Sequence, residues 1–346
     1  MAPIETEIPV IDLAKLETDF NGTAQEIKDV AGNWGFLYVK NHGVDQEKID
    51  RMFEIHDLFF NKTAQEEKES TPWNSIDNAG YDNRRKRPYR DPKTGVEKPG
   101  DPKESFVCRK ESSLEHPYPP TLAKLKPEIQ SFMREIHDKI AMNILKCLSV
   151  AVGLPSDYLG NLHKYDDPSF TTLRLMHYPA SDGPVDYDTR LPAHTDHDVI
   201  TLLFQDRIMG LQVRPPHYSG PIAEDEEWLD APIIPGAVLI NIGETLSFLS
   251  GGVMKSTWHR VVKSPRPEDW GKERFSMAYF CHATEFTPLK CIEGIKGAEK
   301  REAPISCVTG KQIETVRDWI QHRHSYRGYV LETKPPAPVA MNGITV

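Results

Sequence analysis

From about residue 170 onward, the chain is divided into short runs of apolar and β-branched residues that proline and glycine interrupt. Runs of this kind are typical of β-strands, and their close spacing is typical of antiparallel sandwiches and barrels. No regular strand–helix alternation and no Gly-rich dinucleotide fingerprint accompany them, which disfavours a nucleotide-binding fold. We expect a mainly β protein with strands at 170–178, 200–205, 211–214, 237–242, 257–262 and 274–282.

The first half of the chain carries helical periodicity instead, with a single early strand at 36–39. Thr23 and Thr63 are each followed three residues later by glutamate, a pattern typical of a helix N-terminus. Asp45 is a third candidate cap, and Pro127 is placed to start a long apolar helix. Helices are expected at 23–33, after Asp45, after Thr63, over about 127–154, and near the C-terminus at 309–324.

Residues 71–104 break every periodicity and combine proline, glycine and charged side chains. They predict a long loop, which in a compact domain commonly acts as a lid or binding loop. The basic run between Arg84 and Arg90 lies here. Because acidic residues outnumber Lys plus Arg by 51 to 42, giving a net charge of −9, nucleic-acid binding is disfavoured. A solvated loop is the expected role of this run, and attraction of an anionic substrate is a second interpretation.

Cysteine usage and the N-terminus indicate the compartment. The five cysteines form no Cys-x-x-Cys pair, and their number is odd, so free thiols are expected. The chain begins without a basic and apolar leader, and its longest apolar stretch, 140–154, is interrupted by polar residues. A cytoplasmic protein without membrane insertion is predicted.

The segment around His194 carries candidate metal ligands. In an extended chain, residues i and i+2 share a face, so His194 and Asp196 can offer a nitrogen and an oxygen to one metal. His259 from a facing strand would complete a set of two histidines and one carboxylate. That set leaves open coordination positions and suits non-haem Fe(II). The alternative is a group of ordinary surface or core polar residues.

Arg274 and Ser276 are also separated by two positions and share one face of an expected strand. A guanidinium and a hydroxyl together can bind a carboxylate, with arginine able to form two parallel hydrogen bonds. A metal beside a carboxylate receptor describes a site for a chelating keto acid. The alternative is an ordinary surface pair.

Several further motifs stand in order along most of the chain. They are Ile8–Leu13, Trp34–Val44, Asp101–Phe106, His194-Thr-Asp196, Gly210–Val213, Pro235–Gly243, Trp258–Val262 and Arg274-Phe-Ser276. Together they resemble the iron- and 2-oxoglutarate-dependent dioxygenases of the isopenicillin N synthase-like class. The resemblance implies a double-stranded β-helix core (a jelly roll, cupin-like) with flanking helices. Within one compact unit we expect an N-terminal region at 1–120, a supporting helix at 121–160, the jelly-roll core at 165–290, and a C-terminal helix and tail at 291–346.

The resemblance also implies residue roles. His194, Asp196 and His259 match the iron ligands, and Arg274 and Ser276 match the pair that holds the distal carboxylate of 2-oxoglutarate. Tyr178 matches a tyrosine that adds a third hydrogen bond, whereas Met176 stands where many plant members have asparagine. No catalytic residue beyond the metal centre is implied. Candidates for the substrate pocket are Arg174, Met176, His197, Phe204 and Phe280, with His197 expected to face away from the iron.

The implied reaction needs Fe(II), 2-oxoglutarate and O2, with ascorbate as a supporting reductant. It forms succinate and CO2 while a small molecule of secondary metabolism is hydroxylated, desaturated or cyclised. No protein partner is implied. Two alternatives stay open: an oxidase of the isopenicillin N synthase or ethylene-forming type, which binds its own substrate's carboxylate, and a non-catalytic jelly-roll binding module.

Overall fold

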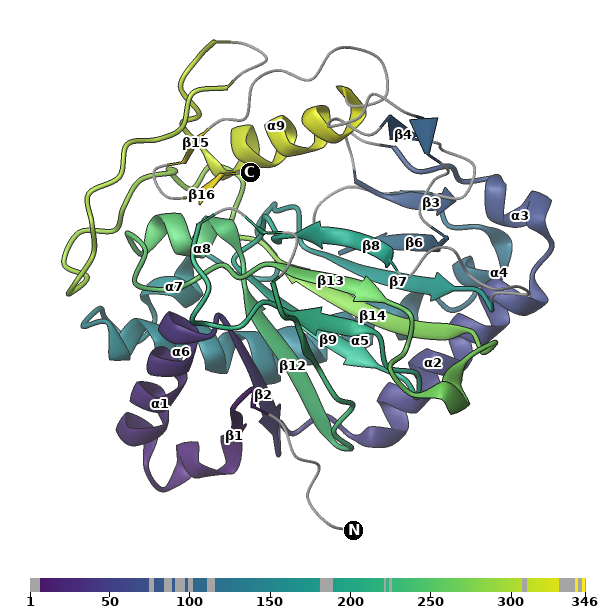
Figure 1. The fold of residues 1–346 in the computed structure, drawn as a ribbon, viewed down its shortest axis with the longest axis horizontal. Coiled ribbons are helices and arrows are strands. Elements are labelled where there is room, and N and C mark those ends of the chain that lie inside the picture. Colours follow the sequence, from purple (N-terminus) through teal and green to yellow (C-terminus); the bar gives the residue numbers. More distant parts are fainter. Residues whose placement is uncertain are drawn as a thin grey trace.

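Two β-sheets pack face to face at the centre of the molecule (Figure 1). The computed structural model describes residues 7–345 except 75–77, 84–88, 91–96, 99–101, 111–115, 181–188, 221, 224–225, 307–309, 330–339 and 342–343. The larger sheet has the order β1 (Val10–Asp12), β2 (Phe36–Lys40), β12 (Ala237–Ile242), β9 (Ile200–Gln205), β14 (Arg274–Cys281), β7 (Thr172–Tyr178), β6 (Glu104–Arg109), β3 (Gly80–Asn83). The smaller sheet has the order β11 (Leu229–Asp230), β10 (Leu211–Val213), β13 (His259–Val262), β8 (Thr189–His194).

Strand β14 shows how the sheets divide the interior. Phe275, Met277 and Tyr279 on one side of the strand belong to a large apolar cluster that includes residues from the helices. Ala278 on the other side belongs to a second cluster that lies between the two sheets. Because successive side chains of a strand point to opposite faces, the helix-facing core and the inter-sheet interior are lined by alternate residues. The sheet arrangement confirms the predicted jelly-roll core.

Helices cover the outer face of the larger sheet, where Ile27, Met52, Ile136 and Leu145 enter the large cluster. The long predicted helix at 127–154 is continuous in space but contains a π-helical stretch, His137–Ala141. The helices are α1 (Phe20–Asn33), α2 (Gln46–Lys62), α3 (Gln65–Glu69), α4 (Pro120–Ala123), α5 (Lys126–Ile136), α6 (Met142–Ala151), α7 (Tyr158–Asn161), α8 (Glu244–Leu249) and α9 (Val316–Tyr329). Short 3-10 turns occupy Leu13–Glu17 and Pro267–Asp269, and two short hairpins pair β4 (Tyr89–Arg90) with β5 (Glu97–Lys98) and β15 (Ala340–Met341) with β16 (Ile344–Thr345).

Both predicted threonine caps are wrong. Helix α1 begins after Asp19, whose carboxylate accepts a hydrogen bond from the backbone N–H of Gly22 at 3.0 Å. Thr23 lies inside that helix and is buried. Thr63 has an extended backbone and ends α2, while α3 follows Ala64 without a side-chain cap. Aspartate competes well with threonine as a cap, so the earlier acid starts the helix.

Two other expectations need correction. The loop predicted at 71–104 contains strand β3, which pairs antiparallel with β6, because β6 offers a free edge to a segment with little periodicity of its own. Most of the remaining loop, including Arg84–Arg87, lies outside the described residues. The C-terminal helix runs over Val316–Tyr329 instead of 309–324.

In the described part of the chain, no helix is both long and apolar enough to cross a membrane. The cytoplasmic location and the division of the chain into four parts stay predictions.

Candidate metal centre

The three predicted metal ligands lie close together in the structure. They are His194, Asp196 and His259. His194 ends β8, His259 begins β13, and the two histidines are paired across these antiparallel strands. Asp196 follows in the loop after β8. Its Oδ1 atom lies 3.8 Å from His194 Nε2 and 3.7 Å from His259 Nε2. The ligand atoms of all three residues lie within 4.8 Å of one another, as a shared metal requires.

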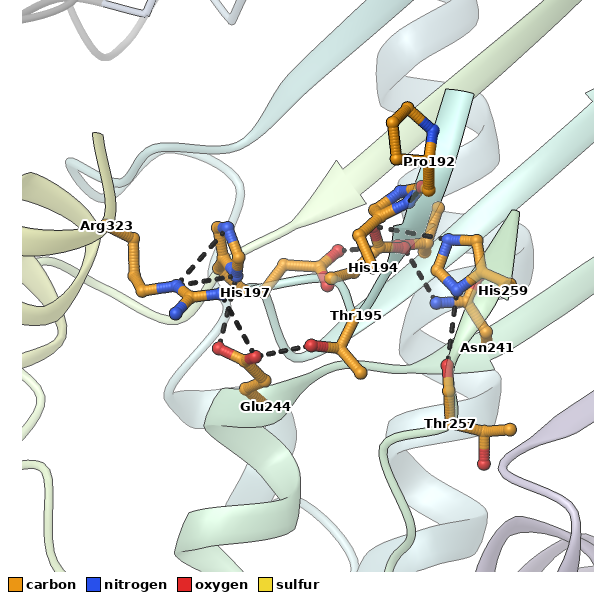
Figure 2. Close-up of polar contacts among 12 residues, drawn as sticks. Pro192, His194, Thr195, His197, Asn241, Glu244, Thr257, His259 and Arg323 are labelled. Carbon is orange, nitrogen blue, oxygen red and sulfur yellow. Dashed lines mark hydrogen bonds and ion pairs between the residues drawn. The ribbon is translucent and has the colours of Figure 1, made fainter. Parts of the chain in front are cut away.

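Backbone carbonyls orient both imidazoles (Figure 2). His194 Nδ1 lies 2.9 Å from the Pro192 carbonyl oxygen, and His259 Nδ1 lies 3.2 Å from that of Thr257. A carbonyl oxygen only accepts, so each Nδ1 carries a hydrogen, and in the neutral imidazole that binds a metal the lone pair is then on Nε2. Both lone pairs are therefore available on the side where Asp196 lies.

The two oxygens of Asp196 have different tasks. Oδ2 accepts hydrogen bonds from Thr201 Oγ1 at 2.6 Å and Asn241 Nδ2 at 2.7 Å, which leaves Oδ1 to face the imidazoles. Burial acts to raise the pKa of Asp196, but the adjacent His259 and His194 and these two hydrogen bonds outweigh it and hold the pKa below its ordinary value. Two neutral imidazole nitrogens and one ionised carboxylate oxygen are a donor set that fits Fe(II).

Thr201 and Asn241 were not among the predicted site residues. They stand directly opposite each other on β9 and β12. Alternation along these two strands places them on the inter-sheet side, next to apolar Leu203 and Leu239. A polar residue on an otherwise apolar strand face is a signal that sequence reasoning could have used.

Glu244 at the start of α8 holds the loop that carries Asp196 (Figure 2). Its backbone N–H donates to the Asp196 carbonyl at 2.8 Å, and its carboxylate accepts from Thr195 Oγ1 at 2.5 Å. His197 lies outside the group of metal ligands. Its Nδ1 atom is 3.1 Å from Glu244 Oε2, and Arg323 of α9 contacts both residues. Neither Glu244 nor Arg323 was predicted, because no local motif joins them to the metal segment.

Arg274 is buried between the sheets with 2% of its surface exposed. Its guanidinium donates to Ser276 Oγ at 3.0 Å and Gln205 Oε1 at 3.1 Å, and its buried Nε has no hydrogen-bond partner within the described part of the chain. Arg274 forms no ion pair with any carboxylate that the structure describes. Burial lowers the pKa of the guanidinium, which nevertheless remains cationic. Arg274 and Ser276 are therefore both buried, which excludes the alternative of an ordinary surface pair.

Tyr178 and three of the predicted pocket residues lie near this pair. Tyr178 stands opposite Arg274, and its ring centre lies 5.2 Å from the Arg274 guanidinium carbon. Met176 stands opposite Ser276, and Arg174 stands opposite Ala278 on the inter-sheet side. The Arg174 guanidinium carbon lies 6.0 Å from the centre of the Phe280 ring. Arg174, Met176 and Phe280 are therefore brought together on the inner face.

The structure does not place Phe204 on the inner face, where a substrate-pocket residue was predicted. Phe204 belongs to the helix-facing cluster, and its ring centre lies 5.7 Å from that of Phe132 in α5. It stands opposite Met277, which also faces the helices. Because the period of a strand is two, Phe204 and Leu203 point to opposite sides of β9. Phe204 therefore packs in the core, away from the inter-sheet interior.

Comparison with known proteins agrees with this geometry. A family model for the 2OG-Fe(II) oxygenase superfamily matches residues 169–283, and one for the N-terminal region of the non-haem dioxygenase in morphine synthesis matches residues 8–128. A UPF0676 protein of Schizosaccharomyces pombe is 31% identical over 328 residues, covering 92% of each chain. Flavonol synthase 1 of Crocosmia x crocosmiiflora is 30% identical, covering 80% of this chain and 75% of its own.

A solved structure gives the same result. A full-length Neurospora crassa protein, crystallised in complex with alpha-KG (2-oxoglutarate), aligns with a TM-score of 0.76 and 28% identity, covering 93% of this chain and 98% of the Neurospora chain. The chain described here belongs to the 2OG-Fe(II) oxygenase superfamily. It is thus an oxidoreductase of the dioxygenase type that uses Fe(II), 2-oxoglutarate and O2.

Proposed function

We propose that His194, Asp196 and His259 hold the Fe(II) of this dioxygenase. We further propose that Arg274 and Ser276, with Tyr178, bind the distal carboxylate of 2-oxoglutarate. The observation that carries the second assignment is the buried guanidinium of Arg274, whose hydrogen-bond partners among the described residues are neutral. An uncompensated buried charge is costly, and a dicarboxylate cosubstrate would supply the missing counter-charge.

Each of these residues has a defined task. The carbonyl contacts at Nδ1 keep both histidines ready to donate through Nε2, and Thr201 and Asn241 fix the Asp196 carboxylate. Arg274 orients the cosubstrate from its far end, while the apolar cluster between the sheets excludes water. When bound, the iron supplies the redox chemistry that couples decarboxylation of 2-oxoglutarate to oxidation of the substrate by O2.

We propose that the substrate is a small molecule that contacts Arg174, Met176 and Phe280. The guanidinium of Arg174 would bind an anionic or oxygen-rich group, and the Phe280 ring would pack against an apolar part. Structures of the Neurospora protein contain thymine or 5-formyluracil, which are small molecules of this general kind. A role for His197 in the pocket, a place in secondary metabolism, and the choice among hydroxylation, desaturation and cyclisation stay predictions.

The test combines metal analysis with product analysis. The purified protein is reconstituted anaerobically with Fe(II) and given 2-oxoglutarate, O2 and a panel of small metabolites, and succinate is measured. His194→Ala and His259→Ala are expected to lose stoichiometric iron and succinate formation, because each removes one of the protein's ligands. His217→Ala, at an exposed histidine outside the site, is the control.

Two results would count against the proposal. Full iron binding and turnover in both ligand variants would remove the metal assignment. Substrate oxidation without succinate release would instead favour the oxidase alternative, in which Arg274 binds the carboxylate of the primary substrate.

A further inference from the structure

Arg323 connects the C-terminal helix to the loop that carries Asp196. It lies on α9, and its Nε atom is 3.2 Å from Nδ1 and 3.4 Å from Nε2 of His197. Its Nη2 atom is 3.3 Å from Glu244 Oε1. Figure 2 shows Arg323 reaching from α9 toward these two residues on the side away from His194 and His259.

Glu244 links this contact to the metal ligands. Its side chain is fully buried, with 0% exposed, and the same carboxylate contacts Thr195, His197 and Arg323. Thr195 and His197 are the immediate neighbours of Asp196 in the chain. A shift of the Glu244 carboxylate would therefore move both flanks of Asp196.

The first turn of α8 reinforces this connection through the backbone. The N–H of Glu244 donates to the Asp196 carbonyl at 2.8 Å, and that of Thr245 donates to the Asp198 carbonyl at 3.1 Å. Thr245 Oγ1 donates to the His197 carbonyl at 2.6 Å. The loop from Thr195 to Asp198 is thus fixed to the start of α8, and α8 is fixed to α9 through Arg323.

The contact between Arg323 and Glu244 is an ion pair. A buried carboxylate needs compensation, and the Arg323 guanidinium supplies a positive charge to Glu244 from a side chain that is only 12% exposed. Without Arg323, the buried Glu244 carboxylate would lose a positive charge 3.3 Å away. We expect the loop to shift around Glu244 and to loosen the backbone on both sides of Asp196, while Thr201 and Asn241 still bind its carboxylate.

We propose that Arg323 is a positioning residue for the metal centre, and that docking of α9 is energetically coupled to metal binding. This inference rests on the proposed metal ligands and adds α9 to the elements that support them. Coupling free energies are reciprocal. If Arg323 strengthens metal binding by some factor, bound metal must stabilise the docked arrangement of Arg323 by the same factor.

The experiment titrates the metal-free protein with Co(II), an oxygen-stable probe, and follows its absorption. Arg323→Gln is expected to weaken Co(II) binding by roughly tenfold, as is usual when a residue that supports metal ligands is lost. Arg317→Gln is the matched control. Arg317 lies on the same helix and also pairs with a buried glutamate, Glu285, which does not contact the metal loop. Its Co(II) affinity is expected to stay within twofold of the wild type.

Two further measurements separate positioning from general packing. In a double-variant cycle, Arg323→Gln combined with Glu244→Gln is expected to lose less Co(II) affinity than the sum of the single losses, because either change alone already removes the ion pair between the two side chains. In hydrogen exchange, Co(II) is expected to slow the amides of residues 318–324 in the wild type but not in Arg323→Gln.

Equal Co(II) affinity in Arg323→Gln and the wild type would overturn the inference, and so would an equal loss in Arg317→Gln. If Arg323→Gln does not fold, Arg323→Lys decides, since it keeps the charge but cannot form both contacts. An intermediate affinity supports positioning and an unchanged affinity overturns it. Failure of the proposed function is distinct, because His194→Ala would then bind Co(II) as well as the wild type does.

Discussion

Arg274 and Arg214 are both buried arginines with different surroundings. Arg214 pairs with Glu226 at 2.5 Å, and both of those side chains are almost completely buried. Among the described residues, the hydrogen-bond partners of the Arg274 side chain are the neutral Ser276 and Gln205. The first arrangement is complete within the chain, whereas the second leaves a positive charge for a ligand. This difference supports the proposal that Arg274 binds a ligand, whereas Arg214 has a structural role.

Arg274→Gln is expected to weaken 2-oxoglutarate binding by about 3–5 kcal/mol, since a buried carboxylate would lose its charged partner. This corresponds to a rise of at least roughly a hundredfold in the 2-oxoglutarate dissociation constant of the Co(II) protein. Arg274→Lys should recover only part of the loss, because an ammonium cannot form two parallel bonds. Arg214→Gln is the control, expected to reduce stability without this loss. An unchanged 2-oxoglutarate affinity in Arg274→Gln would contradict the assignment.

Motif reasoning pointed to the residues that we propose bind iron and 2-oxoglutarate, but it missed the residues that position them. His194, Asp196 and His259 belong to short segments whose spacing is informative. The contact between Arg323 and Glu244 joins residues 79 positions apart. Asn241 reaches Asp196 across 45 positions. Such contacts arise only once the sheets and helices have packed, so no pattern within one segment could reveal them.

At the scale of elements, strand β7 carries a polar network on its helix-facing side. His177 Nδ1 lies 2.8 Å from Glu104 of β6, and His177 Nε2 lies 2.9 Å from Glu273 next to β14. Lys68 of α3 lies 3.3 Å from the same Glu104 carboxylate. Burial acts to raise the pKa of Glu104, but hydrogen bonds with His177 and Tyr81 and the charge of Lys68 outweigh it and lower the pKa.

Glu104→Gln is expected to lower the free energy of unfolding by about 3 kcal/mol near pH 7, since it leaves buried Lys68 without its carboxylate partner. A lowered folded-state pKa gives stability that is present above the ordinary value of 4.5 and is lost as the pH falls through the folded-state pKa. The difference between wild type and variant should therefore shrink as the pH falls below 4.5. Denaturant unfolding at several pH values measures it.

Glu273→Gln is the matched control for that network. It removes the carboxylate on the other ring nitrogen of His177, but the Glu273 side chain is 39% exposed and water can replace it. A much smaller loss of stability is expected. Equal losses in the two variants, or a loss independent of pH in Glu104→Gln, would show that the lost pairing of Glu104 with Lys68 is not the cause.

Strand limits were predictable where apolar and β-branched residues dominate, as in β9 (Ile200–Gln205) and β12 (Ala237–Ile242). They were not predictable for β8, which contains Pro192, or for β3, whose four residues include one apolar side chain. Both of these strands lie at sheet edges, where pairing with a single neighbour defines them. Propensity cannot supply what a neighbouring strand supplies.

At the scale of the whole molecule, the interior contains two apolar clusters, and we expect the larger one to determine stability and the smaller one to affect ligand binding. The larger cluster joins helices to the outer face of the larger sheet, and the smaller one lies around the inter-sheet interior. One methionine from each cluster, Met277 from the larger and Met176 from the smaller, allows the two clusters to be compared. Met277 is fully buried in the larger cluster, and Met176 lies in the smaller one opposite Ser276.

Met277→Ala is expected to lower the free energy of unfolding by about 2–5 kcal/mol, the usual result of a cavity in a packed core. Its Co(II) and 2-oxoglutarate affinities should stay within twofold of the wild type. Met176→Ala should instead change 2-oxoglutarate affinity several-fold, because it opens space beside Ser276. Denaturant unfolding and ligand titration of both variants measure these effects. The reverse pattern would contradict the division.

The alternation along β14 has a consequence for how this protein can diverge. Arg274 and Ser276 face one side, Phe275 and Met277 face the other, and the strand is held by neighbours on both edges. A one-residue insertion or deletion would carry Arg274 into the helix layer and a phenylalanine into the proposed cosubstrate site. We therefore expect relatives of this chain to differ along β14 by substitutions and not by insertions or deletions. Changes in length are confined to the connections between strands, where new specificities can be added without disturbing the frame.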